Sequence, residues 1–222
     1  MYKITTWTSG LFSLILLGCQ STPQAIDLYN KVGQPAEANF ESNASKKTIQ
    51  HGHYASNNGT LELVDEGEEA SIYNFDQEKA VDVKFQGKAI NEDYGAKVVV
   101  YRDSVAFISI KAHESAVDDY FSTFIRELGE PNGLDADSIE LKSIDASVKS
   151  SLEKAFPNTV QVYKDDFNTE VLHYPQQLFY VKGNVSYFIS LDPIGNKVNL
   201  NIDIISEKAL NDAVITGYHV SQ

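Results

Sequence analysis

Alternating apolar and polar residues predict the strands of this chain. The clearest case runs from Val198 to Ile204, where every second residue is aliphatic and the residues between are Asn or Asp. This period of two is typical of a strand with one face buried and one face in water. The segments that show it are 81–85, 185–191 and 198–204. Short polar links further predict two antiparallel hairpins, from 97–101 with 105–110 and from 178–181 with 185–191.

A period near 3.6 predicts the helices. Between Ala116 and Leu128 the apolar side chains recur three, four, seven, eight and eleven residues after the first, and Gly129 and Pro131 follow as helix stops. A second helix is expected after a cap at Asp145 or Ser147, and a third from Ser206 to about Gly217. Together with the hairpins, this predicts an α+β fold with a mainly antiparallel sheet and about three packed helices.

The charge balance restricts the class of partner. The 222 residues are 42% hydrophobic and 22% charged, as in ordinary globular proteins. The 31 acidic residues outnumber the 18 Lys and Arg, which gives a net charge of −13. Nucleic-acid binding needs a basic face, so we expect no nucleic-acid partner. An acidic protein instead favours a basic protein partner and fast electrostatic association.

The first eighteen residues are typical of a secretory signal. Lys3 precedes an apolar run at 11–17, which Gly18 and Cys19 close. The nine residues 10–18 would form a helix of about 14 Å, whereas a bilayer core is about 30 Å thick. This segment is therefore too short to span a membrane.

The end of this leader, Leu16-Leu17-Gly18-Cys19, resembles the lipobox of bacterial lipoproteins. The resemblance covers only the leader. It implies that Cys19 becomes the first residue of the mature protein and carries acyl chains that hold it on a membrane. Gln20 follows where inner-membrane lipoproteins of Gram-negative bacteria tend to have Asp, so the resemblance implies an outer-membrane anchor with the body facing the periplasm.

Composition then divides the chain into three parts. Residues 1–18 form the signal peptide, and the polar stretch 19–58, which Pro23, Gly33 and Pro35 interrupt, is interpreted as a lipidated N-terminus with a flexible tether. The periodic segments all lie in 59–222, which is interpreted as one globular α+β domain.

Residue patterns for catalysis or for binding a metal or cofactor are weak. The chain lacks a Gly-x-Ser-x-Gly elbow and a phosphate-binding glycine loop, so we expect no catalytic residue and no cofactor. His51 and His53 share a face of an extended segment, but a metal site would need a third ligand from His113, His173 or His219. The acidic stretches 65–69 and 135–140 lack the spacing of a calcium loop. No metal site is therefore expected.

Aromatic residues suggest a binding face instead. Phe179 and Phe188 lie on strand faces opposite those assigned to the core. Either a partner or ligand covers this second face, or the second helix packs on it while the first helix covers the other.

These observations predict a non-catalytic protein-binding module anchored by lipid. It would act as an immunity or inhibitor protein, or as an accessory subunit of an envelope assembly. Two alternatives remain open. One is an envelope hydrolase or metal-binding enzyme built from scattered His and acidic residues, and the other is a carrier of an apolar ligand with an internal cavity between sheet and helix.

Overall fold

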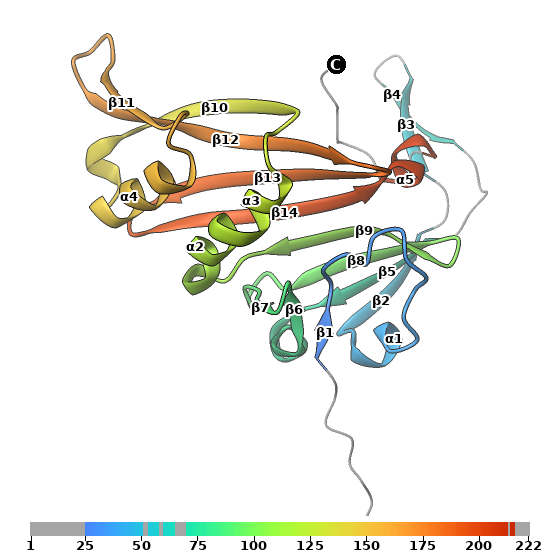
Figure 1. Ribbon diagram of the computed structural model, residues 1–222. Coiled ribbons are helices and arrows are strands. Elements are labelled where there is room, and N and C mark those ends of the chain that lie inside the picture. Colours follow the sequence, from blue (N-terminus) through green and yellow to red (C-terminus); the bar gives the residue numbers. More distant parts are fainter. Residues whose placement is uncertain (1–24, 51–52, 58–59, 65–69, 213, 216–222) are drawn as a thin grey trace, which may run out of the picture.

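One long antiparallel sheet organises the protein (Figure 1). The computed structural model describes residues 25–50, 53–57, 60–64, 70–212 and 214–215, and describes the side chains of these residues except for 53–64. The sheet has nine strands in the order β10-β12-β13-β14-β9-β8-β5-β2, and β11 pairs with β12. Its strands are β2 (Lys46–Gln50), β5 (Ala70–Phe75), β8 (Ala96–Tyr101), β9 (Ser104–Lys111), β10 (Gly133–Glu140), β11 (Gln161–Lys164), β12 (Glu170–Lys182), β13 (Val185–Ile194) and β14 (Lys197–Ser206).

Two smaller sheets accompany it. Strands β1 (Ile26–Asp27), β6 (Val83–Phe85) and β7 (Lys88–Ala89) form the first, in which β1 runs parallel to β6. Strands β3 (His53–Asn57) and β4 (Thr60–Val64) form the second. Because all pairs within the main sheet are antiparallel, the α+β class with a mainly antiparallel sheet is confirmed.

Both predicted hairpins are present, as β8–β9 and β12–β13. Strand β14 matches the clearest alternation, and its core-facing residues Val198, Leu200, Ile202 and Ile204 are all buried. The strand expected at 81–85 is wrong in its first half. Gln77–Asp82 forms a 3₁₀ turn, here called η1, that leaves Val81 57% exposed, and β6 begins only at Val83.

The first predicted helix is confirmed. It consists of α2 (Val117–Tyr120), a π turn (Phe121–Ile125) and α3 (Arg126–Leu128), and it ends at Gly129, whose φ is 76°. All six of its predicted apolar positions are buried. The second, α4 (Ala146–Ala155), begins after Asp145 and buries Val148 and Leu152.

The third predicted helix is shorter than expected, and the helix count is not confirmed. Helix α5 (Glu207–Asn211) has Ser206 as its N-cap, whose Oγ accepts the Ala209 N–H at 3.2 Å. An additional short helix, α1 (Phe40–Asn43), lies in the segment that was expected to be a tether.

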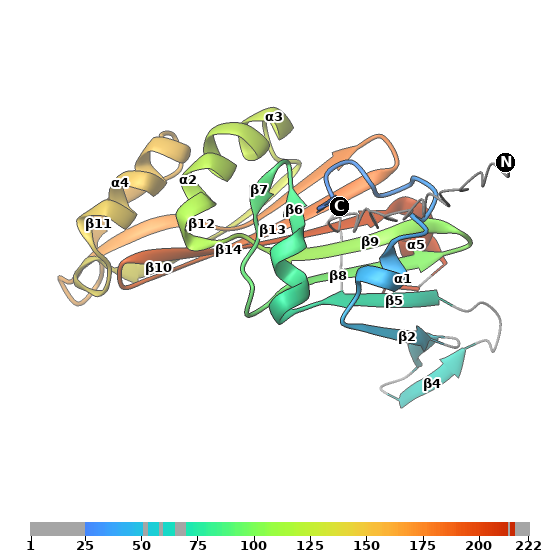
Figure 2. The ribbon, with the colours of Figure 1, turned by 90° about the horizontal axis from the view of Figure 1, so that it is seen from below.

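Helices α2, α3 and α4 all lie on one face of the sheet (Figure 2). Their side chains join the main hydrophobic core, for example Phe124 and Leu152 with Leu178 of β12. Helix α5 lies on the opposite face at one end, where Ala209 packs with Val99 and Phe107. The second predicted helix therefore does not cover the face that carries Phe179 and Phe188, whose ring centroids are 4.9 Å apart.

The expectation of a flexible tether up to residue 58 is wrong for residues 25–50. Ile26, Leu28 and Phe40 are at most 2% exposed and belong to the main core. Their apolar side chains are widely spaced, so the average composition of the segment stays polar although each of these side chains is fully buried. We call residues 26–40 the N-terminal strap.

Candidate protein-binding surface

The hairpin of β11 and β12 lies at one end of the sheet (Figure 1). Its turn carries Phe167. Asp165 organises this turn, because its Oδ1 accepts the N–H of Phe167 at 2.9 Å and the N–H of Thr169 at 2.8 Å. The backbone N–H of Asn168 also donates to the Asp165 carbonyl at 2.9 Å. Phe167 is 88% exposed, so an ordered turn holds a large apolar side chain in water.

Strand β11 carries further exposed apolar side chains. Val162 is 41% exposed and Tyr163 is 46% exposed, although both sit in a paired strand. Aromatic side chains that are exposed on an ordered scaffold are typical anchors of protein interfaces, because they bury a large area while few torsion angles become fixed.

A hydroxyl and imidazole cluster fixes the position of Tyr163. The Ser138 Oγ lies 3.0 Å from the Tyr163 Oη and 3.2 Å from the His173 Nδ1, and the two rings meet edge to face at 6.3 Å. A serine next to a histidine is also the start of a nucleophilic site, but catalysis would need a third group that orients the imidazole. In this structure the Ser138 hydroxyl group and the His173 ring both contact Tyr163 and position its ring.

Asp137 protects the outer edge of β10. One of its carboxylate oxygens accepts the Ser138 backbone N–H at 2.7 Å, and the other accepts Gln176 Nε2–H at 3.0 Å. An open sheet edge can pair with a strand from another chain, and an occupied N–H weakens that pairing. A partner at this end of the sheet would therefore contact side chains rather than add a strand.

This end of the sheet is acidic. Residues 133–142 and 161–170 each contain three acidic residues and one lysine. Asp165 and Asp166 directly precede the exposed phenylalanine. We call Phe167, Tyr163 and the carboxylates of these two ranges the distal surface.

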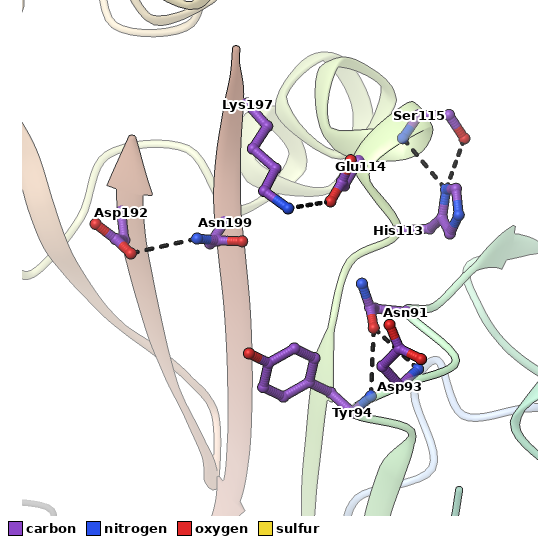
Figure 3. A network of polar contacts seen from close by, with 9 residues as sticks. All are labelled: Asn91, Asp93, Tyr94, His113, Glu114, Ser115, Asp192, Lys197 and Asn199. Carbon is purple, nitrogen blue, oxygen red and sulfur yellow. Dashed lines mark hydrogen bonds and ion pairs between the residues drawn. The ribbon is translucent and has the colours of Figure 1, made fainter. Parts of the chain in front are cut away.

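His113 and His173, two of the possible metal ligands, lie in different parts of the described structure. His113 is the N-cap of a short 3₁₀ turn, where its Nδ1 accepts the Ser115 N–H at 3.2 Å and lies 2.8 Å from the Ser115 Oγ (Figure 3). His173 contacts Ser138 and the ring of Tyr163, and the structure does not describe the side chain of His53. His51, His219 and the acidic residues 65–69 lie outside the described residues. Within the described part of the chain, no group of three His, Cys, Asp or Glu residues is placed to hold a metal ion.

The polar contacts around His113 are hydrogen bonds and an ion pair at the protein surface (Figure 3). Glu114 forms an ion pair with Lys197, which lowers the pKa of the glutamate and raises that of the lysine. Both side chains are well exposed, so this pair adds little to stability. Asn91 Oδ1 accepts the N–H of Asp93 and of Tyr94 and thereby shapes the loop before β8.

An open groove with a volume of about 580 Å³ lies between α5 and the β8–β9 hairpin. Arg102 and Lys208 lie over the Tyr101 ring there, and both form ion pairs with Asp212. A groove of about 210 Å³ lies between the strap and strands β13 and β14. The space between α2–α4 and the sheet is filled with core side chains, which counts against an apolar-ligand cavity at that position.

The leader and Cys19 lie outside the described residues. The described residues include no helix with the length and apolar character needed to cross a membrane. Comparisons with protein-family models, with curated proteins and with solved structures found no match.

The sequence did contain a signal for the distal turn. An Asp followed three residues later by an Asn is common in tight turns, and Asp165 and Asn168 enclose an aromatic residue here. Nothing in the local pattern indicates that this turn lies at the end of the sheet, because β11 shows no period-two alternation and that of β10 is limited to residues 134–137.

Proposed function

We propose that this protein is a lipid-anchored, periplasm-facing envelope protein that acts by binding another protein and not by catalysis. Its docking element is the distal surface. The observation that carries the proposal is Phe167, 88% exposed and held by the ordered Asp165 turn. Exposing a phenylalanine to water is unfavourable, and burying it in a partner would recover about 1.5–3 kcal/mol.

The negative charges around Phe167 favour a partner with a positively charged surface. The carboxylates of the distal surface would be repelled by an anionic surface and attracted by a cationic one. A partner with an apolar pocket and a rim of Lys or Arg therefore fits best. A toxic effector that an immunity protein neutralises, or a subunit of an envelope assembly, would fit if its surface has this chemistry.

The lipid anchor rests on the lipobox resemblance at 16–19. Each buried CH₂ contributes about 0.8 kcal/mol, so two or three acyl chains on Cys19 would hold the protein stably on the membrane. Intact-mass analysis tests this part directly, because an unmodified chain that still begins with Met1 would contradict it.

Capture from a native envelope tests the binding function. The tagged full-length lipoprotein, the Phe167→Ala variant and a Val181→Ala control are crosslinked in cells and purified. Val181 is also an exposed apolar residue, but it lies at the other end of β12. We expect the wild type and the control to retain a basic partner, and Phe167→Ala to bind it about 30-fold more weakly, as for the loss of a hot-spot side chain worth about 2 kcal/mol. Equal recovery by all three proteins would refute the docking role of Phe167.

A further inference from the structure

The N-terminal strap is fixed to the folded body close to where the chain enters it. Strand β1 pairs with β6, with Ile26 opposite Val83. The Asp27 carboxylate accepts three backbone N–H groups, from Tyr29 at 2.9 Å, Gln86 at 3.0 Å and Gly87 at 2.7 Å. Leu28 is fully buried, and its N–H donates to the Lys84 carbonyl at 2.8 Å. The chain is therefore held in place from Ile26 onward.

This attachment shortens the connection between Cys19 and the body. From Cys19 to Ile26 the chain can span at most about 25 Å when fully extended. A free tether that continued to residue 58 would instead have a typical span of about 30–35 Å and a much larger maximum reach. A lipidated Cys19 thus keeps the β1 end of the body close to the bilayer.

We propose that the surface formed by η1 and the β6–β7 turn faces the lipid headgroups of the membrane that holds Cys19. This inference rests on the lipid anchor of the proposed function. Because Ile26 pairs with Val83, the short connection enters the body next to η1. Val81 of η1 is 57% exposed, so an apolar side chain lies at this point.

The local charge is close to neutral. Residues 77–89 contain Lys79, Lys84 and Lys88 and two acidic residues, and the carboxylates of Asp27 and Glu127 accept hydrogen bonds from the β6–β7 turn. In a chain whose net charge is −13, anionic headgroups repel this surface less than they repel the remaining acidic surface. The short connection therefore supplies most of the orientation.

The distal surface then faces away from the membrane. In Figure 1, β1, β6 and β7 lie low in the view, under one half of the sheet, whereas β11 lies at the upper end of the other half. The view from below places β11 at the far end of the sheet from α1 and β2 as well (Figure 2). The short connection thus points Phe167 toward a partner in the periplasm.

The single cysteine of the chain makes the test site-specific. Once Cys19 carries lipid, a cysteine introduced elsewhere is the only free thiol. Val81→Cys and Phe167→Cys are labelled with a donor fluorophore in the full-length lipoprotein, which is then reconstituted in vesicles of phosphatidylethanolamine and phosphatidylglycerol that contain a headgroup-labelled acceptor. Energy transfer as a function of acceptor density gives the distance of closest approach. A third protein carries a flexible 20-residue insertion after Gln24 in addition to Val81→Cys.

We expect a distance of closest approach under about 25 Å for the label at 81. The label at 167 should give a clearly larger distance, and the insertion should increase the distance at 81. Equal distances at 81 and 167, in protein whose mass confirms lipid on Cys19, would overturn the orientation and leave the anchor in place. An unmodified Cys19 would overturn both the orientation and the anchor.

Discussion

Removing the Asp27 carboxylate should release the N-terminal strap. In Asp27→Ala the N–H groups of Tyr29, Gln86 and Gly87 lose their acceptor. A hydrogen bond to a charged group contributes about 1.5–3 kcal/mol when buried. Asp27 is only half-buried, so we take about 1 kcal/mol for each bond, and we expect a loss of about 3 kcal/mol in the free energy of unfolding.

The Asp27→Asn variant separates the contributions of the two carboxylate oxygens to stability. In Asp27→Asn, the remaining carbonyl oxygen can still accept from Tyr29 and Gln86, since both donate to Oδ1. The new amide group would face the N–H of Gly87, which donates to Oδ2 in the native chain. Two donors then oppose each other, and we expect a loss of about 1–2 kcal/mol, between wild type and Asp27→Ala.

Urea denaturation of the detergent-solubilised chain measures both values, with Asp166→Ala as an exposed-carboxylate control that should change stability by less than about 0.5 kcal/mol. Hydrogen exchange adds a local readout. The Leu28 amide, which donates to Lys84, should exchange faster in Asp27→Ala by a larger factor than amides of β14. A loss below about 0.5 kcal/mol with unchanged exchange at Leu28 would refute the clamp role of Asp27.

Three further substitutions test the fold. Gly95→Ala should unfold or severely destabilise the protein, because the new Cβ would lie 1.8 Å from the Phe75 carbonyl oxygen. Gly195→Ala has open space around the new Cβ, so its free energy of unfolding should fall by only about 1 kcal/mol because of the positive φ. Equal melting temperatures of the two variants would contradict this prediction. Leu152→Ala should lower the free energy of unfolding measured by urea denaturation by about 2–5 kcal/mol, because Leu152 is fully buried between α4 and the sheet. A smaller loss would mean that the surrounding residues move in to fill the cavity. Burial raises the pKa of Tyr180 to about 12 from an ordinary value of about 10. The neutral form of this tyrosine therefore contributes fully to folding stability below pH 10, and the contribution is lost as the pH rises toward 12. Tyr180→Phe should therefore flatten the fall of the urea midpoint between pH 10 and 12, and an unchanged slope would exclude this cause.

Local periodicity determined the central elements of the fold. The helix at 117–128 and the strand at 197–206 repeat their apolar residues at the period of their own backbone, so every neighbour needed for the prediction lies a few residues away. The β8–β9 and β12–β13 hairpins need only a short turn between two such patterns. The lipobox is equally local, and it remains a prediction about residues that the structure does not describe.

Long-range packing decided the rest. The polar stretch at 25–50 became part of the body because Leu28 and Phe40 meet core residues that lie far along the chain, and no window of sequence contains both partners. Strand β10 exists because β12 pairs with it, although most of its residues are exposed and its alternation is limited to residues 134–137. The same pairing brings Ser138 to His173, and the pairing of β11 with β12 places Phe167 in a turn at the end of the sheet. The sequence therefore determined the elements with their own periodicity, and only the tertiary structure decided which surfaces remain exposed to a partner or a membrane.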